Sequence, residues 1–404
     1  MTSRRRSAGT PRARAGWLLG MVIASACGDG TPGPATSPPT PFDLPIAVSS
    51  GGPVLVAPRV QPIFYPGFPF GVEVDAFLAK LQISTYWPAV VGEYGVGPLT
   101  ALPGHVSSVA AGATIVSSAI EDLFAQTMIA DAADLGAPSG DTIYPLFFPP
   151  DTTITSSGVA LCQPGAAGGF HAEWSVNGMR TAVVVIPTCA SFGGGQLTGI
   201  SALTPVISHE LAEAATDPFP TNAPAFINTD AEHAIWSVAV HGGEIADLCE
   251  NEAPNLTTPA DIGLPVSRIW SNAAVMAGTG PCVPVPPGEV YFVAVPELPD
   301  RVAVQRSGVK FTVPALTARL GIDATVNVEL RAEAGMQDSW TVGALEFHAD
   351  SMSSPQPTGL TGVKGQTLRL PVTPTEVAAG IFPLVVSSVR GSAHHFWFGV
   401  VQRQ

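Results

Sequence analysis

The sequence contains little charge, and most of that charge is negative. Only 12% of the 404 residues are charged and 46% are hydrophobic, which excludes a disordered polyelectrolyte and indicates packed cores. Lysine and arginine number 18, beside 32 aspartates and glutamates. Five arginines lie within residues 1–26, so only 13 of these 18 basic residues remain beyond them. The remaining acidic surface repels phosphate backbones, and we expect no nucleic-acid partner.

The N-terminal apolar run is too short to span a bilayer. Five arginines precede it, it covers residues 16–26, and Cys27 follows directly. A basic stretch, a short apolar core and small residues before a cleavage point are typical of a secretory signal. Ala24-Ser25-Ala26 before Cys27 is similar to a lipobox, in which the cysteine is lipidated after cleavage. An ordinary signal-peptidase site is the alternative.

We therefore expect residues 1–26 to be a signal peptide and Cys27 to be the site of lipidation. The expected location is the cell envelope, with a lipid anchor in the outer membrane, or the secreted fraction. The membrane is then a partner through this anchor, and an envelope polymer or protein is the other expected partner.

Cysteine is scarce beyond Cys27, and no C-x-x-C pair is present. A zinc site made only of cysteines is therefore disfavoured, whereas four cysteines in an exported protein suit two disulfides. Sequence order favours pairing Cys162 with Cys189 and Cys249 with Cys282, while the other two pairings stay open.

Glycine and proline are abundant, with 42 and 40 residues, and predict many turns and short strands. Residues 27–50 are rich in Pro, Gly, Ser and Thr, so we expect a flexible tether. Residues 51–285 would form the main domain. Residues 288–404 contain eight short apolar runs without helical spacing, which predict a C-terminal immunoglobulin-like β-sandwich.

The main domain is expected to be α/β (α+β), with a mixed sheet and one chemically important helix. Residues 181–187 are a continuous β-branched run typical of a central strand. The helix is expected to start at Thr204 and Pro205 and to end before Pro218.

This helix carries a His-Glu-x-x-Glu motif. His209 and Glu213 are four residues apart, so they share one face and can chelate one cation. Glu210 is adjacent and is the candidate general base acting on a metal-bound water. The arrangement resembles the His-Glu-x-x-His helix of zinc proteases with glutamate as the second ligand, and predicts a zincin-like domain. The expected cofactor is zinc or another divalent cation.

Further acidic residues lie downstream of the motif. Asp217 follows one turn later, and Glu244 and Asp247 belong to a second acidic cluster; each is a candidate ligand or orienting acid. A purely structural interpretation competes, in which the glutamates form a solvated helix face and Asp217 bonds the backbone. Isolated histidines are more often surface or hydrogen-bonded residues than ligands, and this applies to His171, His233 and His241. His394 and His395 are expected to lie at the end of a strand.

These segments together resemble the exordium (phosphate-induced protein) family over roughly residues 50–285. Plant members of this family are secreted cell-wall proteins linked to growth. The resemblance implies an exported protein with two disulfides and a metalloprotease-like helix, with His209, Glu210, Glu213 and Asp247 as its site residues. The Cys162-Gln163-Pro164 stretch departs from the plant pattern near His171. The segments that carry the resemblance are residues 52–55, 63–65, 169–171, 209–213, 216–218, 244–250 and 270–272.

Two functions follow as expectations. The first is metal-assisted hydrolysis of a peptide or similar envelope polymer by a lipid-anchored protein. The second is a non-catalytic surface or matrix protein, in which the motif is structural and the C-terminal domain binds glycan or protein.

Overall fold

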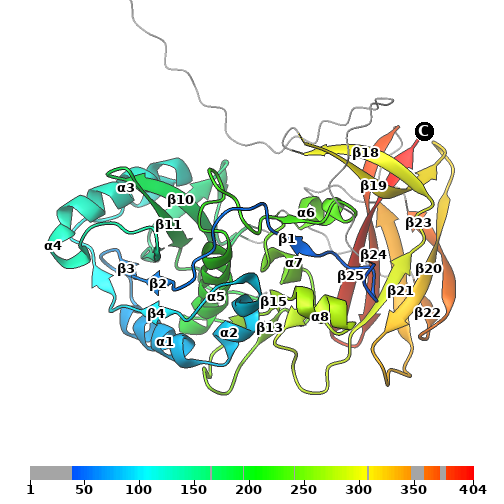
Figure 1. The fold of residues 1–404 in the computed structure, drawn as a ribbon, viewed down its shortest axis with the longest axis horizontal. Helices are drawn as coiled ribbons and strands as arrows, with labels where there is room; N and C mark the ends of the chain where they lie inside the picture. The colour runs from blue at the N-terminus through cyan, green and yellow to red at the C-terminus, as the bar shows by residue number, and fades with distance from the viewer. Residues whose placement is uncertain are drawn as a thin grey trace, which may run out of the picture.

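A computed structural model describes residues 39–163, 166–193, 195–240, 242–306, 309–346, 359–373 and 379–404. The chain is a mixed α/β structure with curled sheets (Figure 1). Within these ranges, no helix combines the length and apolar character needed to cross a membrane. The expected signal peptide and its lipidation site, Cys27, lie outside the described residues.

A seven-stranded mixed sheet organises the first part of the described chain. Its order is β10-β11-β7-β2-β4, and β3 pairs with both β7 and β5. All pairs are parallel except β10 with β11. The strands are β2 (Arg59–Val60), β3 (Ile63–Phe64), β4 (Thr100–Ala101), β5 (His105–Val106), β7 (Thr142–Phe147), β10 (Phe170–Val176) and β11 (Met179–Ile186).

Helices cover both faces of this sheet. Along β7, Ile143 and Phe147 join one hydrophobic cluster, whereas Tyr144 and Leu146 join the other, because successive side chains alternate between faces. The first cluster includes apolar residues of α1, α2 and α5, and the second includes those of α3. The helices and connecting strands are α1 (Gly71–Ile83), α2 (Tyr86–Val91), η1 (Gly92–Tyr94), β6 (Thr114–Val116), α3 (Ser117–Ala130), α4 (Ala132–Leu135), β8 (Thr153–Ser156), β9 (Val159–Ala160) and α5 (Ile200–Thr216).

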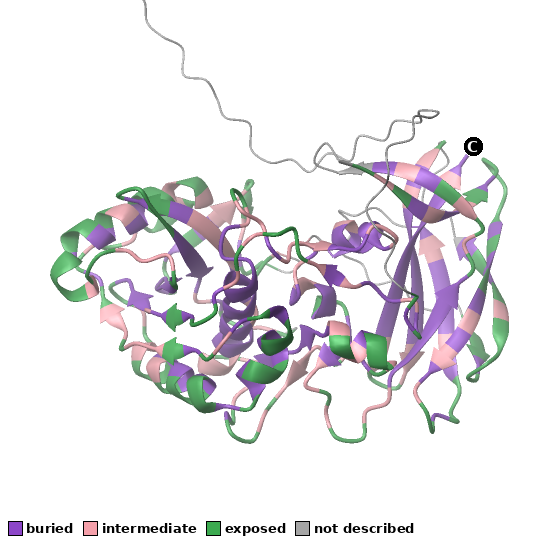
Figure 2. Cartoon of the chain, in the orientation of Figure 1, coloured by how far each residue is buried: buried purple, intermediate pink, exposed green. Residues whose placement is uncertain are grey.

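Helix α5 begins earlier than the sequence predicts. It starts at Ile200, so Pro205 lies inside it rather than at its first position. A proline inside a helix removes one backbone hydrogen bond, and here Pro205 lies in the first two turns, next to the buried residues Leu203 and Thr204. The helix ends before Pro218, as predicted. It is buried along nearly its whole length (Figure 2), so the interpretation of its glutamates as a solvated face is wrong.

The immunoglobulin-like β-sandwich expected for residues 288–404 is wrong. The described strands form one curled nine-stranded sheet in the order β17-β20-β23-β21-β24-β25-β19-β18, with β22 on β21. Alternating burial, as along β20, specifies one buried face for each strand, but not whether these faces belong to two sheets or one. The strands are β17 (Phe292–Pro296), β18 (Asp300–Arg306), β19 (Val309–Ala318), β20 (Ala324–Ala332), β21 (Trp340–Glu346), β22 (Leu360–Gly362), β23 (Thr367–Thr373), β24 (Gly380–Arg390) and β25 (Ala393–Arg403).

The zincin-like fold expected for residues 51–285 is also wrong. The α5 helix lies on a curled, mainly parallel sheet inside a mixed α/β structure. The prediction rested on a single helical motif, and a motif of five residues specifies local geometry without specifying the sheet behind it.

Short elements connect the two large sheets (Figure 1), and their apolar side chains belong to the same hydrophobic cluster as both sheets. Trp236 packs against Phe398 with ring centroids 4.9 Å apart. The His395 ring pairs with Glu252, whose other oxygen accepts the backbone N–H of Phe396. The connecting elements are β12 (Asn228–Thr229), α6 (Ala234–Ala239), α7 (Asp247–Glu250), β13 (Leu256–Thr257), β14 (Val266–Ser267), β15 (Ile269–Trp270), α8 (Asn272–Ala277) and β16 (Cys282–Val283).

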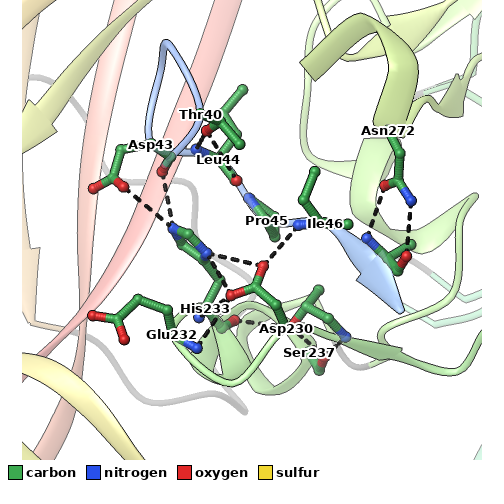
Figure 3. Close-up of polar contacts among 12 residues, drawn as sticks. Thr40, Asp43, Leu44, Pro45, Ile46, Asp230, Glu232, His233, Ser237 and Asn272 are labelled. Carbon is green, nitrogen blue, oxygen red and sulfur yellow. Dashed lines mark hydrogen bonds and ion pairs between the residues drawn. The ribbon is translucent and has the colours of Figure 1, made fainter. Parts of the chain in front are cut away.

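Residues 39–50, expected to belong to a flexible tether, are packed into the molecule. Leu44 is fully buried, and β1 (Ala47–Val48) pairs with β12. The Asn272 side chain both accepts from and donates to the Ala47 backbone, at 2.8 Å each (Figure 3). Composition alone suggests a tether here, but the few apolar residues of the segment fill gaps between the two large sheets.

A buried histidine holds this segment in place. Figure 3 shows His233 between Asp230 and Asp43: Nδ1 lies 3.0 Å from the Asp230 carboxylate and Nε2 lies 3.1 Å from the Asp43 carbonyl oxygen. The second Asp230 oxygen accepts the Ile46 N–H at 2.8 Å. Trp397 on β25 donates to the same Asp43 carbonyl. His233 is therefore a structural residue that joins three parts of the fold.

Candidate metal centre

Helix α5 supplies most of the candidate site. His209 and Glu213 are one turn apart, and the His209 Nε2 lies 3.3 Å from Glu213 Oε2. The same nitrogen lies 3.5 Å from Asp247 Oδ1, at the start of α7. One potential ligand atom from each of these three residues lies within 4.8 Å of the others. The structure thus brings together the three residues that the sequence predicts to bind a cation.

Glu213 also fixes the loop that carries Asp247. Its Oε1 accepts the backbone N–H groups of Ala246 and Asp247, each at 3.2 Å. One carboxylate oxygen therefore orients the second acidic segment, while the other faces the imidazoles.

His171 on β10 completes the site, although the sequence analysis left it out as a ligand. Its Nδ1 lies 3.7 Å from Glu213 Oε2, and its Nε2 lies 3.4 Å from Glu244 Oε1. Its strand partner is Val184, which belongs to the core on the α5 face of the sheet. Directly paired strand residues have side chains on the same face of a sheet. A prediction that the strand at His171 pairs with residues 181–187 would therefore have placed the His171 side chain on the face that α5 covers.

Glycines allow the close approach of these segments. A Cβ on Gly169 would lie 2.8 Å from both the Val185 carbonyl oxygen and a Val206 methyl group, which would separate β10 from α5. A Cβ on Gly242 would lie only 1.4 Å from the Asp247 carboxylate. The Gly169 and Gly242 positions therefore have no space for a side chain while the site keeps its geometry.

The convergent side chains line a cavity of about 630 Å³. Apolar residues such as Phe192, Val206 and Val240 form part of its wall. None of the described lining residues is Lys or Arg, so His171 and His209 are the basic residues among them. The acidic and histidine residues that line it are His171, His209, Glu210, Glu213, Glu244, Asp247 and Glu250.

Burial and mutual repulsion disfavour negative charge on several of these carboxyls. Burial raises the pKa of Glu210 to about 8 and that of Glu250 to about 7. Burial likewise raises the pKa of Glu244, Asp247 and Asp217, with further increases from neighbouring carboxylates. Without a cation, this cavity therefore favours protonated carboxyls.

For Glu213 and the two imidazoles, neighbouring charges outweigh burial and favour the charged form. Burial would raise the pKa of Glu213, but His209 and His171 lower it far below its usual range. Burial would lower the pKa of His171, but Glu244, Glu213 and Glu210 raise it to about 10. The carboxylates around His209, led by Glu213, likewise raise its pKa well above the usual value. In the absence of a cation, protons on the imidazoles supply the positive charge in this site.

Three buried side-chain atoms at the site make no hydrogen bond: His171 Nε2, Asp217 Oδ2 and Glu244 Oε1. Asp217 is fully buried, and its other oxygen accepts the Ala225 N–H at 2.6 Å. Buried polar atoms in folded proteins are normally paired, so these three atoms are available to a further partner.

The spacing of the atoms fits a coordinated cation. Two ligands bound about 2.0–2.1 Å from a tetrahedral ion lie about 3.3–3.4 Å apart. The separations from His209 Nε2 to Glu213 and Asp247 are 3.3 and 3.5 Å, longer than most charge-assisted hydrogen bonds. Imidazole and carboxylate ligands suit Zn²⁺ and similar divalent ions. The residues present therefore fit a divalent cation.

Disulfides brace two of the contributing segments. Cys162 pairs with Cys189, and Cys249 pairs with Cys282, which is the pairing that sequence order favours. The first bond ties the loop that precedes β10 to the end of β11, and Cys249 lies two residues after Asp247. Two such disulfides indicate an extracellular or cell-surface location, because thiols in the cytosol are kept reduced.

The other predicted residues lie as follows. Glu210 and Glu244 line the cavity, and Asp217 lies at the end of α5 near His171 and Glu244. Cys27 and His241 lie outside the described residues. The histidines at 233 and 395 pair with other carboxylates, apart from this site.

Comparisons with known proteins add no family. No family model matches the chain, and no curated protein matches it. A crystal structure of domains 4 and 5 of the S-layer protein SbsC is similar over 34% of this chain and 80% of that chain. The sequence identity is 14% and the TM-score is 0.15. At this level the similarity carries no argument about function.

Proposed function

We propose that this exported protein binds a divalent cation through His209, Glu213 and Asp247 and uses it for metal-assisted hydrolysis. The convergence of these three side chains within 4.8 Å is the observation that supports the proposal most directly. Zinc is the first candidate, because one imidazole and two carboxylates leave a tetrahedral position open to water.

The cation would supply Lewis-acid activation of a bound water. Glu210 lines the same cavity and lies outside this group of three, although it forms a similar group with His171 and Glu213. A bound cation would lower the raised pKa of Glu210, so that its carboxylate could accept the proton of that water as general base. Glu213 holds the Asp247 segment against α5 through two backbone hydrogen bonds and thereby positions two of the three ligands. The substrate class we propose is a peptide or similar polymer of the cell envelope.

The cell-surface location favours an envelope substrate, and we propose that Cys27 provides the lipid anchor after cleavage of residues 1–26. Relationship to the exordium family remains part of this proposal and rests on the sequence motifs alone. Mass spectrometry of the mature N-terminus tests the anchor: a diacylated Cys27 is expected, and an unmodified N-terminus would contradict it.

Metal analysis of the full mature protein tests the cation site. Zinc should co-purify or bind after chelation and reconstitution, and His209→Ala should weaken this binding at least about 100-fold. His105→Ala is a matched control, because this histidine pairs with Asp131 and does not line the cavity. Equal, negligible zinc in the wild type and in His209→Ala would end the proposal.

A purely structural cation is the second candidate, and the near-complete burial of Glu213 favours it. Measuring substrate turnover distinguishes this role from hydrolysis. Activity on casein and peptidoglycan panels should disappear in Glu210→Gln while zinc content stays unchanged. A protein whose melting temperature falls with chelator, but which turns over neither substrate, would support the structural cation instead.

A further inference from the structure

A second group of side chains lies beside the first and shares none of its residues. His171, Asp217 and Glu244 each offer a potential ligand atom within 4.8 Å of the others. They come from β10, from the end of α5 and from the loop before α7. We propose that this group binds a second divalent cation, an inference that rests on the proposed cation-binding function of the same cavity.

The unpaired atoms are the main support. Each of the three residues has one buried atom without a hydrogen bond: Nε2 of His171, Oδ2 of Asp217 and Oε1 of Glu244. The His171 side chain is only 5% exposed, and Asp217 is fully buried. A buried polar atom without a hydrogen bond is costly, and one cation held by all three residues would give these atoms a partner.

The distance between the two best-placed atoms fits the same coordination geometry as the first group. His171 Nε2 lies 3.4 Å from Glu244 Oε1, close to the separation of about 3.3–3.4 Å between neighbouring ligands of a tetrahedral ion. One imidazole and two carboxylates repeat the ligand types of the group formed by His209, Glu213 and Asp247.

Glu213 links the two groups. Its Oε2 lies 3.3 Å from His209 Nε2 and 3.7 Å from His171 Nδ1, so it faces both imidazoles. With Nε2 of His171 on the second cation, its Nδ1–H would point toward Glu213, a ligand of the first. Metal-bound histidines commonly donate the N–H of their other ring nitrogen to a carboxylate, which fixes the orientation of the ring.

Charge balance favours two cations over one. Six carboxyls surround the two histidines: Glu210, Glu213, Glu244, Asp247 and Glu250 line the cavity, and Asp217 adjoins it. With all six ionised and both imidazoles neutral, one divalent cation leaves a net charge of about −4, and a second reduces it to about −2. No lysine or arginine among the described lining residues offsets the remainder.

Zinc stoichiometry tests the proposal. The chelated, full mature protein is reconstituted with Zn²⁺, and bound metal is counted by elemental analysis and by calorimetric titration. We expect two equivalents in the wild type and one in His171→Ala. One is also expected in Asp217→Asn, which keeps an oxygen for the Ala225 N–H. His209→Ala should also keep one, and the His171→Ala/His209→Ala double variant none.

Glu250→Gln is the matched control, because Glu250 lines the cavity but belongs to neither group. It should retain two equivalents, and circular dichroism should show that each variant is folded. One equivalent in the wild type, lost only in His209→Ala, would overturn the second site and leave the proposed function standing. Two equivalents in both His171→Ala and Asp217→Asn would overturn it as well. No zinc in the wild type would overturn both proposals.

Discussion

Two of the buried groups of histidine and carboxylate in this molecule differ in how many of their polar atoms are paired. In the cluster of His233 and Asp230, the ring and both carboxylate oxygens have hydrogen-bond partners within the protein. In the cavity cluster, His171, Asp217 and Glu244 each keep a buried atom unpaired. Both clusters join distant segments of the chain, so connection alone does not distinguish them.

The difference separates a structural role from a binding role. A buried ion pair whose hydrogen bonds are all made needs no further ligand, and it specifies how segments meet. In the proposed metal site, an added positive charge would balance the surplus acid and pair the remaining atoms. Burial and residue type are similar in the two places, so the count of satisfied atoms is what distinguishes them.

Removing the carboxylate of the closed cluster should have the largest effect. Asp230→Ala leaves His233 and the Ile46 N–H without their partner in a buried position, and should lower the free energy of unfolding by about 3–5 kcal/mol. Urea unfolding measures this loss. Zinc stoichiometry should stay unchanged, and a parallel loss of zinc would show that the two clusters are not independent.

The closed cluster should also make stability depend on pH. Burial would lower the pKa of His233, but Asp230 and Asp43 raise it to about 9. Because this value exceeds that of the unfolded chain, the stabilisation is complete below about pH 6.5 and is lost as pH rises toward 9. The loss reaches about 3 kcal/mol at most.

Unfolding in chelator at several pH values measures this dependence, with His233→Gln as the comparison. The difference in stability between wild type and variant should shrink between pH 6.5 and 9. A difference that stays constant over this range would show that His233 is not protonated in the folded protein.

The open cluster should respond to cations where the closed one does not. Zinc at 100 times its dissociation constant should stabilise the chelated protein by about 2.7 kcal/mol for one site. His233→Gln, although less stable, should gain the same amount per site, whereas Glu213→Gln should lose the gain of the first site and keep that of the second. Thermal melting with and without zinc measures both, and a zinc-induced shift in Glu213→Gln as large as in the wild type would contradict the assignment of Glu213 as a ligand.

The smallest effect should be opposite in sign for the two clusters. In chelator, burial raises the pKa of Glu244 and favours its protonated form, which the amide of Glu244→Gln resembles, so stability should stay equal or rise by about 1 kcal/mol. The equivalent change in the closed cluster, Asp230→Asn, should destabilise. Urea unfolding of both variants tests the contrast, and two losses of equal size would remove the distinction between the clusters.

Prediction from sequence succeeded where the decisive contacts are local. The four-residue spacing of His209 and Glu213 on a helix, the end of that helix before Pro218 and the buried strand at residues 181–187 all follow from local periodicity. It failed for His171, because its role depends on a strand pairing that brings it onto α5 from a distant part of the chain.

The larger errors have the same origin. Alternating burial in residues 288–404 is compatible with a sandwich and with one curled sheet, and only long-range pairing separates them. Residues 39–50 have the composition of a tether, yet Leu44 is fully buried because the core supplies partners that composition does not reveal.

The sequence by itself determined a helix that presents an imidazole and a carboxylate on one face, and a surplus of acid over base. Helical periodicity and ionisation are local properties, so they can be read without the fold. Only the tertiary structure decided that β10 and the loop before α7 meet that helix, and which buried atoms stay unpaired there. Those outcomes depend on packing between segments far apart in the chain, where each hydrogen-bond partner is a matter of position rather than of residue type.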